Sequence, residues 1–456
     1  MMRSDTAAMR PAKWQDVGAG RRSVDSGIAA GGDGVSGADP RRAGWETIPL
    51  RYVCELNPSV AFDGFDEDDD LTFLPMDRVK SGYFIPNTDK LSKYGSSYTA
   101  FEDGDIVLAK VTPCFENGNI AIADGLVSGK GFGSSELFVI RPTTAERRFL
   151  FYYFQSLTFK QAGEASMTGA GGLKRVSPDI LRQHHLPLPS QDIQRLIASY
   201  LDRETARIDG LIAEKERMLA LLEEKRAALI NRVVTRGLDP TARLRPSSQE
   251  WLGEIPAHWE MSRLKYLGET VLGLTFNPDD LVNEGEGMLV LRASNVKNRK
   301  IVLEDNIFVQ TDIPQKLRTK PFDILICSRS GSRALIGKNA LITNETSDLT
   351  FGAFMTVYRS SLNRFLFWVF NSTLFEFQAG AFGTSTINQL TTETLANMEV
   401  PTPPLEERDA IAEFLEQTSI RFDNTMSAVS QSIDLAKERR AALISAAVTG
   451  QIPLER

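Results

Sequence analysis

The chain has 456 residues, of which 42% are hydrophobic, 24% charged and 9% aromatic. This composition is that of a globular protein and excludes a fibrous or wholly disordered chain, and the length predicts two or three domains. The formal net charge of −7 argues against a protein that coats nucleic acid on its own, but it does not exclude local basic surfaces, because charges act over a Debye length of about 10 Å.

The sequence shows no sign of export or of a membrane segment. Its most apolar stretches, FLFYYF at 149–154 and FLFWVF at 365–370, are six residues long, whereas a helix needs about 20 apolar residues to cross a bilayer. Three cysteines (Cys54, Cys114, Cys327) lie far apart without CxxC spacing, which disfavours a disulfide framework and a structural zinc site. We therefore expect a cytoplasmic protein.

The first part of the chain predicts a leader and one globular domain. Residues 1–43 are rich in Gly, Ala, Ser, Asp and Arg and have no periodicity, which predicts a disordered leader. Within 44–185, short apolar runs such as DIVLAKV, NIAIA and ELFVI alternate with Gly, Pro, Asn and Asp. This pattern predicts strands and loops, and the apolar segment FLFYYFQS predicts a helix that follows them.

At Gln191 the pattern changes to that of one long helix within 186–240. Apolar residues follow the alternating 3–4 spacing of a heptad seam, and Gly237 with Pro240 ends it. A helix of about 45 residues is about 65–70 Å long and needs a partner along its seam. The predicted seam residues are Ile197, Leu201, Ile208, Leu211, Met218, Leu222 and Leu229.

After a linker at 241–258, the chain repeats itself at an offset of 214–218 residues. FLFWVFNS corresponds to FLFYYFQS, VPTPP to LPLPS, and ERRAALI at 438–444 to EKRAALI at 224–230. The repeat predicts a second domain at 259–399 and a second long helix at 400–450. The seam predicted for this helix consists of Ile411, Leu415, Phe422, Val429, Ala436 and Leu443.

The duplication predicts how the parts are arranged. Each long helix has one apolar seam, and the linker is too short for the return that a parallel pair would need, so we expect an antiparallel pair. The expected fold is α+β: two pseudo-repeated mixed α/β domains with twisted, mainly antiparallel sheets, held apart by an antiparallel coiled coil. B-DNA advances about 34–36 Å per turn, so two such readers would fit half-sites one or two turns apart. A bivalent protein clamp would use the same architecture.

The repeated segments resemble the specificity subunit of type I restriction–modification systems. The likeness rests on LPLPSQDIQRLIASYL with EKRAALINRVVTRG, on their counterparts in the second half, on EWLGEIPAHWE at 250–260 and on GDIVLAKVTPCFENGNIAIA at 104–123. It implies that each globular part is a target recognition domain that reads one half of a split double-stranded DNA site. It also implies that the helices dock two methyltransferase subunits, that restriction/translocase subunits join the complex, and that S-adenosylmethionine, ATP and Mg belong to those partners, with no cofactor in this chain.

The residues argue independently against a catalyst. NPSV at 57–60 and NPDD at 277–280 do not form the Asn-Pro-Pro-aromatic motif of an adenine methyltransferase. GKGFGSS at 129–135 lacks the GxxxxGK[ST] spacing of a phosphate loop, and we interpret it as a turn beside a strand. His184-His185 has no Cys or HxxxH companion, so a structural role is favoured over a metal site.

Loops after the predicted strands hold the candidate DNA contacts. Base edges are read by Arg, Lys, Asn, Gln, Ser and Thr, and phosphates are held by Lys and Arg; for any single residue the alternative is a solvated surface group. The candidates in the first domain are Lys80, Tyr83, Lys110, Thr112, Asn117, Lys174 and Arg175. Those in the second domain are Ser294, Asn295, Lys297, Arg299, Ser328, Arg329, Ser330, Arg333, Thr384, Ser385, Asn388 and Gln389.

The sequence thus favours a non-catalytic DNA-recognition and scaffold subunit. Two alternatives remain: a bivalent scaffold whose domains bind protein or peptide, and an orphan relative that occupies DNA without partners. The repeated EKRAALI and ERRAALI are interpreted as two equivalent docking surfaces, one for each partner, at opposite ends of the helix pair.

Overall fold

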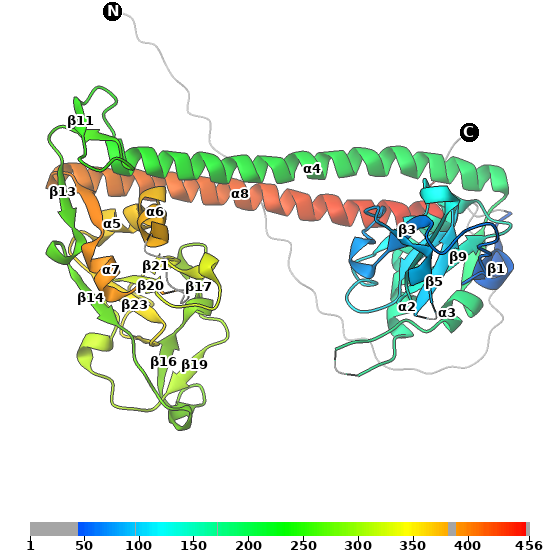
Figure 1. Ribbon diagram of the computed structural model, residues 1–456, viewed down its shortest axis with the longest axis horizontal. Helices are drawn as coiled ribbons and strands as arrows, with labels where there is room; N and C mark the ends of the chain where they lie inside the picture. The colour runs from blue at the N-terminus through cyan, green and yellow to red at the C-terminus, as the bar shows by residue number, and fades with distance from the viewer. Residues whose placement is uncertain (1–43, 96, 171, 382–388, 453–456) are drawn as a thin grey trace, which may run out of the picture.

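The computed structural model describes residues 44–95, 97–170, 172–381 and 389–452. Two long helices, α4 (Gln191–Arg236) and α8 (Leu405–Val448), lie side by side, and one globular domain hangs from each end of the pair (Figure 1). The predicted leader, residues 1–43, lies outside the described residues. Across the part of the chain that is described, no helix is both long and apolar enough to cross a membrane.

Both domains are built from short strands and short helices. The elements of the first domain are β1 (Glu46–Pro49), β2 (Cys54–Leu56), β3 (Asp70–Leu74), β4 (Thr88–Lys90), β5 (Tyr98–Glu102), β6 (Ile106–Ala109), β7 (Ile120–Ile122), β8 (Lys130–Ser134), β9 (Leu137–Pro142), α1 (Arg147–Gln155), α2 (Leu157–Ala165), α3 (Asp179–Gln183) and β10 (His185–Leu188). A hairpin of β11 (Leu244–Pro246) and β12 (Glu254–Pro256) occupies the linker. The second domain consists of β13 (Glu260–Arg263), β14 (Glu269–Leu272), β15 (Leu281–Val282), β16 (Met288–Leu291), β17 (Val296–Lys297), β18 (Lys300–Ile301), β19 (Ile307–Val309), β20 (Ile324–Cys327), β21 (Asn339–Leu341), β22 (Thr350–Phe351), β23 (Met355–Arg359), α5 (Asn363–Phe370), α6 (Thr373–Ala381), α7 (Thr392–Asn397) and β24 (Glu399–Thr402).

Each domain contains two four-stranded sheets. The sheet nearer the helix pair is antiparallel, in the order β2-β9-β6-β7 in the first domain and β14-β23-β20-β21 in the second. The other sheet is mixed, because β3 pairs with β8, and β16 with β22, in parallel. The mixed sheets differ at their edges: β5 extends the first, and β15 the second. The predicted α+β class with two pseudo-repeated domains and two long helices is confirmed.

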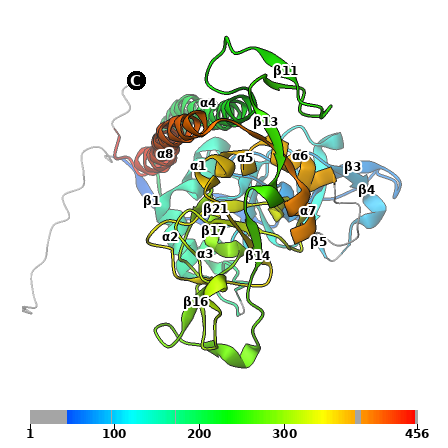
Figure 2. The ribbon, with the colours of Figure 1, turned by 90° about the vertical axis from the view of Figure 1, so that its left-hand side faces the viewer.

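An aromatic helix in each domain packs against the long helices. Helix α1 contacts α4 and α8 in the first domain, and α5 does so in the second; Figure 2 shows both lying beneath the pair. Their aromatic rings are buried because one side of each helix faces a sheet and the other faces the pair. Ile444 of α8 therefore belongs to the core of the first domain, and Ile230 of α4 to that of the second.

Three ion pairs occur once in each half at equivalent positions. At the end of the molecule that holds the first domain, Arg141 holds the buried Asp105 through two hydrogen bonds of 2.7 and 2.8 Å. At the same end, Arg148 pairs with Asp202, and Arg440 of α8 pairs with Asp209 of α4. Their counterparts at the end that holds the second domain are Arg359 with Asp323, Arg364 with Glu416, and Arg226 with Asp423. The repeat therefore extends to individual polar contacts.

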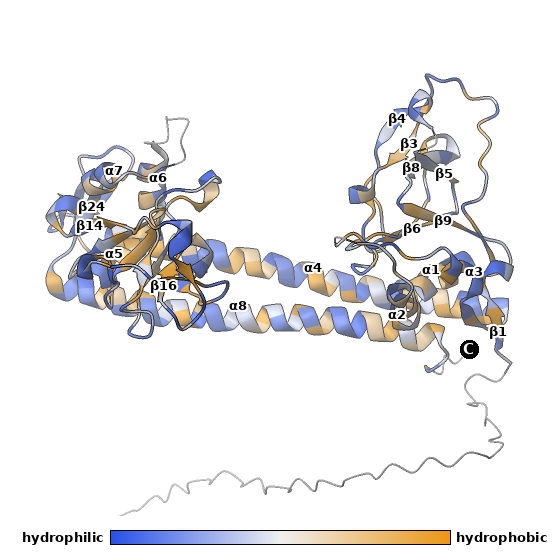
Figure 3. Ribbon diagram, turned by 90° about the horizontal axis from the view of Figure 1, so that it is seen from below, coloured by the Kyte–Doolittle hydropathy of each residue, from blue (hydrophilic) through white to orange (hydrophobic). Residues whose placement is uncertain are grey.

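The two long helices are antiparallel, as expected. Arg226 near the end of α4 reaches Asp423 in the first half of α8, whereas Asp209 in the first half of α4 reaches Arg440 near the end of α8. Polar and apolar residues alternate along both helices (Figure 3). Between the domains the pair buries a small cluster made of Ile208, Ile212, Val429 and Ile433.

Two of the predicted seam positions are wrong. Leu211 and Met218 are 44% and 46% exposed, and the seam instead passes through Ile212 and Leu219. An α-helix drifts by about 20° per heptad relative to a strict 3.5-residue repeat, so after Ile208 the inward position moves on by one residue. The other predicted positions are buried or half-buried: Ile197, Leu201, Ile208, Leu222, Leu229, Ile411, Leu415, Phe422, Val429, Ala436 and Leu443.

The copies EKRAALI and ERRAALI lie at opposite ends of the pair, and each combines buried with exposed positions. Ile230 and Ile444 are buried in domain cores, and Arg226 is 5% exposed between the helices. Packing within this chain accounts for the buried positions of the motif, and its interpretation as two docking surfaces for partners stays a prediction.

The segment GKGFGSS is a strand and not the turn that we had expected. Residues 130–134 form β8 between β3 and β5. A Cβ on Gly131 would lie 2.6 Å from the Phe101 ring and 2.7 Å from the carbonyl oxygen of Thr72. The glycine is therefore explained by close packing inside the sheet.

Candidate nucleic-acid interface

Four of the predicted residues in the first domain gather where β6 ends. Thr112 and Lys174 join two loops, because the Thr112 amide donates to the Lys174 carbonyl at 3.0 Å and the Lys174 amide donates to Thr112 Oγ1 at 3.1 Å. Arg175 forms an isolated antiparallel bridge with Val111. The Lys110 ammonium lies 5.4 Å from the centroid of the Phe138 ring. These contacts make one surface of two distant loops.

Arg175 is already engaged in this surface. Its guanidinium forms a forked contact with the carboxylate of Glu136, with N–O distances between 2.8 and 3.0 Å. The hydrogen bonds and positive charge of Arg175, with a smaller contribution from Lys110, hold the pKa of Glu136 below its usual range despite partial burial. Glu136, which the sequence analysis missed, thus keeps its charge and orients Arg175.

The other three candidates of the first domain lie on a different surface. Lys80, Tyr83 and Asn117 line a hollow of about 740 Å³ between the domain and the helix pair. Residues from both long helices, including Glu216, Lys437 and Arg440, form the opposite wall. The predicted contacts of this domain therefore form two groups.

In the second domain, Arg329 and Gln389 occupy the place that Val111 and Arg175 occupy in the first. They form the equivalent isolated bridge, and Arg329 Nη2 donates to Gln389 Oε1 at 2.7 Å. The guanidinium carbon of Arg329 lies 5.7 Å from the centroid of the Phe354 ring. Phe354, a second residue that the sequence analysis missed, is 58% exposed. Ser294 and Ser330 line the hollow beside it.

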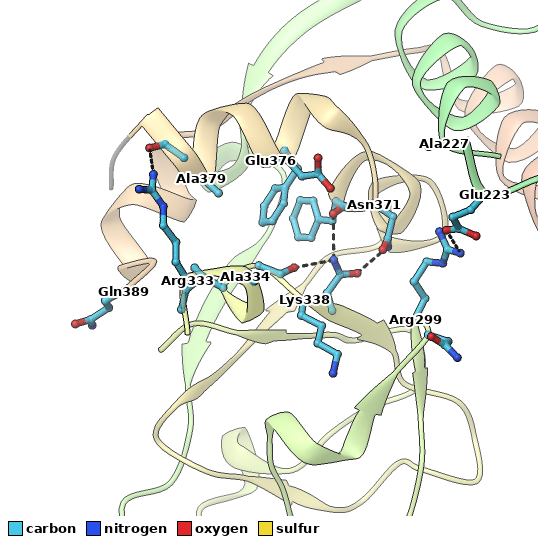
Figure 4. A pocket seen from close by; sticks show the side chains of 17 residues that line it. Glu223, Ala227, Arg299, Arg333, Ala334, Lys338, Asn371, Glu376, Ala379 and Gln389 are labelled. Carbon is cyan, nitrogen blue, oxygen red and sulfur yellow. Dashed lines mark hydrogen bonds and ion pairs between the residues drawn. The ribbon is translucent and has the colours of Figure 1, made fainter. Parts of the chain in front are cut away.

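Arg333 points to a separate pocket of about 540 Å³ between the second domain and α4 (Figure 4). Its guanidinium donates to the Gly380 carbonyl at 3.5 Å, while Lys338 and Glu376 also line the pocket. The remaining candidates on the neighbouring loop, Thr384, Ser385 and Asn388, lie outside the described residues.

Two predicted contacts of the second domain, Asn295 and Ser328, are buried and have structural roles instead. Asn295 is 0% exposed, and its side chain hydrogen-bonds the Arg292 amide and the Val302 carbonyl, which fixes a turn. Ser328 is 4% exposed and donates to the Phe354 carbonyl. A polar residue in a loop can thus satisfy a backbone group of its own turn, as Asn295 does, or of a segment distant in sequence, as Ser328 does. The sequence does not distinguish these roles from a surface role.

Lys297 and Arg299 also have partners within the chain. Lys297 pairs with Glu304, and Arg299 reaches Glu223 on α4 at 3.4 Å (Figure 4). Burial, together with the neighbouring charge of Arg226, lowers the pKa of Arg299. The hairpin of β17 and β18 therefore anchors the second domain to the helices.

His184 has a structural contact. Its Nε2 lies 2.8 Å from the hydroxyl of Tyr153, and burial followed by the charge of His185 lowers its pKa. Within the described ranges, no group of three or more His, Cys, Asp or Glu side chains is placed to hold a metal ion.

Comparison with known proteins gives the same two-part division. Residues 43–217 and 256–434 match the family described as Type I restriction modification DNA specificity domain. The type I restriction enzyme EcoAI specificity subunit of Escherichia coli is 36% identical over 163 residues, which cover 34% of this chain and 27% of that protein. The chain thus spans about a quarter of the length of this curated relative.

A longer match comes from Methanocaldococcus jannaschii. Its type I restriction enzyme MjaVIII specificity subunit is 25% identical over 312 residues, which cover 66% of this chain and 70% of that protein. A solved structure from work on complex assembly and conformational transition of the type I R-M system has a TM-score of 0.70 at 20% identity, covering 90% of this chain and 98% of that one. The last match supports the fold. The chain therefore belongs to the family of the type I restriction modification DNA specificity domain and carries two copies of that domain.

Proposed function

We propose that the chain is the DNA sequence-specificity subunit of a type I restriction–modification complex and has no catalytic activity of its own. Each domain reads one half of a bipartite double-stranded site. The observation that carries the proposal is the pair of equivalent loop junctions, Val111–Arg175 and Arg329–Gln389, at opposite ends of an antiparallel spacer. The backbone there is the same in both halves while the side chains differ, as two readers of different half-sites require.

The helix pair serves as both spacer and scaffold in this proposal. Apolar side chains that the pair leaves exposed, among them Leu211, Met218, Leu221 and Leu435, offer surface to two methyltransferase subunits. Leu221 and Leu435 are repeat equivalents, so each half presents one of them. S-adenosylmethionine would be bound by the methyltransferases, and ATP and Mg by the restriction/translocase subunits. The complex would act on DNA in the cytoplasm.

Co-expression with a type I methyltransferase subunit from the same genome, followed by mapping of methylated adenines, tests the proposal. A split motif with a fixed gap is expected. Methylation without sequence preference would refute the proposal, and specific capture of a protein or peptide by the two domains in place of DNA would favour a bivalent protein scaffold.

A second experiment tests the spacer. Deletion of residues 214–220 together with 428–434 removes seven facing residues from each of α4 and α8. The deletion shortens the helix pair by about 10 Å and rotates the apolar seam by only about 20°. The gap in the DNA motif should shorten while both half-sites keep their sequence. Deletion of 214–220 alone is the control, because it breaks the pairing of the helices and should abolish methylation.

A further inference from the structure

One junction is built identically in both domains but carries different chemistry. The Lys110 amide donates to the Glu136 carbonyl at 3.0 Å, and at the equivalent place the Ser328 amide donates to the Phe354 carbonyl, also at 3.0 Å. The isolated bridges Val111–Arg175 and Arg329–Gln389 complete the correspondence. Three side-chain positions are thereby matched: Glu136 with Phe354, Val111 with Arg329, and Arg175 with Gln389.

The chemistry at these positions changes from an ion pair to an aromatic–arginine pair. In the first domain a carboxylate and a guanidinium face each other, as Glu136 and Arg175. In the second domain the carboxylate is replaced by the ring of Phe354, and the guanidinium comes from Arg329 and lies over that ring. The first junction is therefore charged and polar, and the second offers an apolar contact next to a donor group.

Phe354 is one of several exposed large apolar side chains of its domain, and it is the one that lies against Arg329. It is more than half exposed and borders an apolar hollow of about 860 Å³, which Phe276 and Leu274 also line. An aromatic ring left in water forgoes about 25 cal/mol for each Å² that it could bury. A ligand that presents an apolar group beside a hydrogen-bond acceptor would fit both the ring and the arginine.

The major groove of DNA presents such a pair of groups. The 5-methyl group of thymine is its apolar feature, and the O6 and N7 atoms of guanine are the acceptors that arginine prefers. The distance of 5.7 Å between the Arg329 guanidinium and the Phe354 ring centre lies between one and two base-pair steps of about 3.4 Å. The two side chains can therefore contact neighbouring bases.

We propose that Phe354 and Arg329 determine specificity in the second half-site: Phe354 covers the 5-methyl group of a thymine, and Arg329 donates to a guanine one or two steps away. Gln389 is a positioning residue, since it accepts a hydrogen bond from the guanidinium. The first half-site lacks such a methyl contact, because Glu136 and Arg175 occupy the matching positions. This inference rests on the proposed function and adds the identity of the base atoms that are read.

Modified bases test it atom by atom. In binding assays with the complex of this chain and its methyltransferase, each thymine of both half-sites is replaced in turn by deoxyuridine, which lacks only the methyl group. One position in one half-site should weaken binding about four-fold, the value of one buried methyl group. Replacing the guanine contacted by Arg329 with 7-deazaguanine, which lacks the N7 acceptor, should weaken binding about ten-fold.

The variants assign each effect to its residue. Phe354→Ala should bind thymine and deoxyuridine duplexes equally well while keeping its sensitivity to 7-deazaguanine. Arg329→Met should bind guanine and 7-deazaguanine duplexes equally well while keeping its preference for thymine over deoxyuridine. Phe354→Leu should retain preference for thymine, because it keeps an apolar contact. Phe377→Ala, at an exposed phenylalanine elsewhere in the domain, is the control and should discriminate as the native chain does.

The outcomes separate this inference from the proposed function. If the motif is bipartite but neither half-site contains a position sensitive to loss of the methyl group, or if Phe354→Ala keeps that sensitivity, the inference is overturned and the function stands. If the complex binds all duplexes alike, the proposed function itself fails.

Discussion

The guanidinium of Arg226 lies 2.8 Å from the carboxylate of Asp423 and joins the two long helices beside the second domain. Arg226 also donates to Ser419, and Lys300 of the second domain reaches the same aspartate at 3.0 Å. One carboxylate thus links both helices and the β17–β18 hairpin. The equivalent pair near the first domain, Arg440 with Asp209 at 2.9 Å, is more exposed to solvent.

This asymmetry predicts unequal effects of two matched substitutions. Asp423→Ala leaves Arg226 buried with only the more distant carboxylate of Glu223, at 4.0 Å, which should lower the free energy of unfolding by about 1–3 kcal/mol. Asp209→Ala removes a partly exposed pair and should cost less than about 1 kcal/mol. Both variants replace aspartate by alanine within a helix, so the gain in helix propensity is the same. Urea unfolding followed by circular dichroism measures the difference, and equal losses would contradict the prediction.

The same aspartate predicts a pH dependence. Burial alone would raise the pKa of Asp423, but the hydrogen bond from Lys300 and the charge of Arg226 lower it overall. A carboxyl whose folded-state pKa lies below its unfolded value of about 3.9 stabilises the fold above that value and loses this effect as the pH falls through the folded pKa.

The difference in free energy of unfolding between the native chain and Asp423→Ala should accordingly be constant above about pH 5 and shrink as the pH falls below about 4. Unfolding series at several pH values measure it. A difference that grows on acidification would show that Asp423 is not held as the anion.

The sequence predicted the architecture well because duplication and helix periodicity are properties of the chain alone. The antiparallel pair follows from two seams and a short linker, and the paired ion contacts confirm the repeat. Single functional side chains were harder to predict. Asn295 and Ser328 are residue types that commonly contact DNA, yet the side chains of both hydrogen-bond backbone groups within the domain. Glu136 precedes β9 and Phe354 precedes β23, and both were missed by the sequence analysis. Only the fold brings them next to the loops that begin at Lys110 and Ser328, which lie 26 residues away in the sequence.

The corrected seam gives a prediction for two adjacent residues. Ile212 is buried against α8, so Ile212→Ala should cost about 2–4 kcal/mol, the usual range for such a truncation. Leu211→Ala should change the stability of the isolated chain by less than about 0.5 kcal/mol, because Leu211 is a surface position. Thermal unfolding of the two variants compares them directly. A larger loss of stability for Leu211→Ala than for Ile212→Ala would show that the seam follows the strict heptad pattern predicted from the sequence.

Two glycines should respond in opposite directions to the same change. Gly131 lies in β8, where a Cβ would meet the ring of Phe101 and the carbonyl of Thr72. Neither neighbour is the end of a flexible chain, so Gly131→Ala should destabilise the first domain by about 1–3 kcal/mol through overpacking. Gly210 lies inside α4, and a Cβ there would have no atom within 4 Å.

Gly210→Ala should therefore stabilise the chain by about 0.5–1 kcal/mol, because alanine loses less conformational entropy in a helix than glycine does. Chemical denaturation of both variants measures the two signs under one condition. The added methyl is the same in each case, so a difference in sign isolates the local environment. Stabilisation by Gly131→Ala would mean that residues 129–135 form the open turn expected from the sequence and not a packed strand.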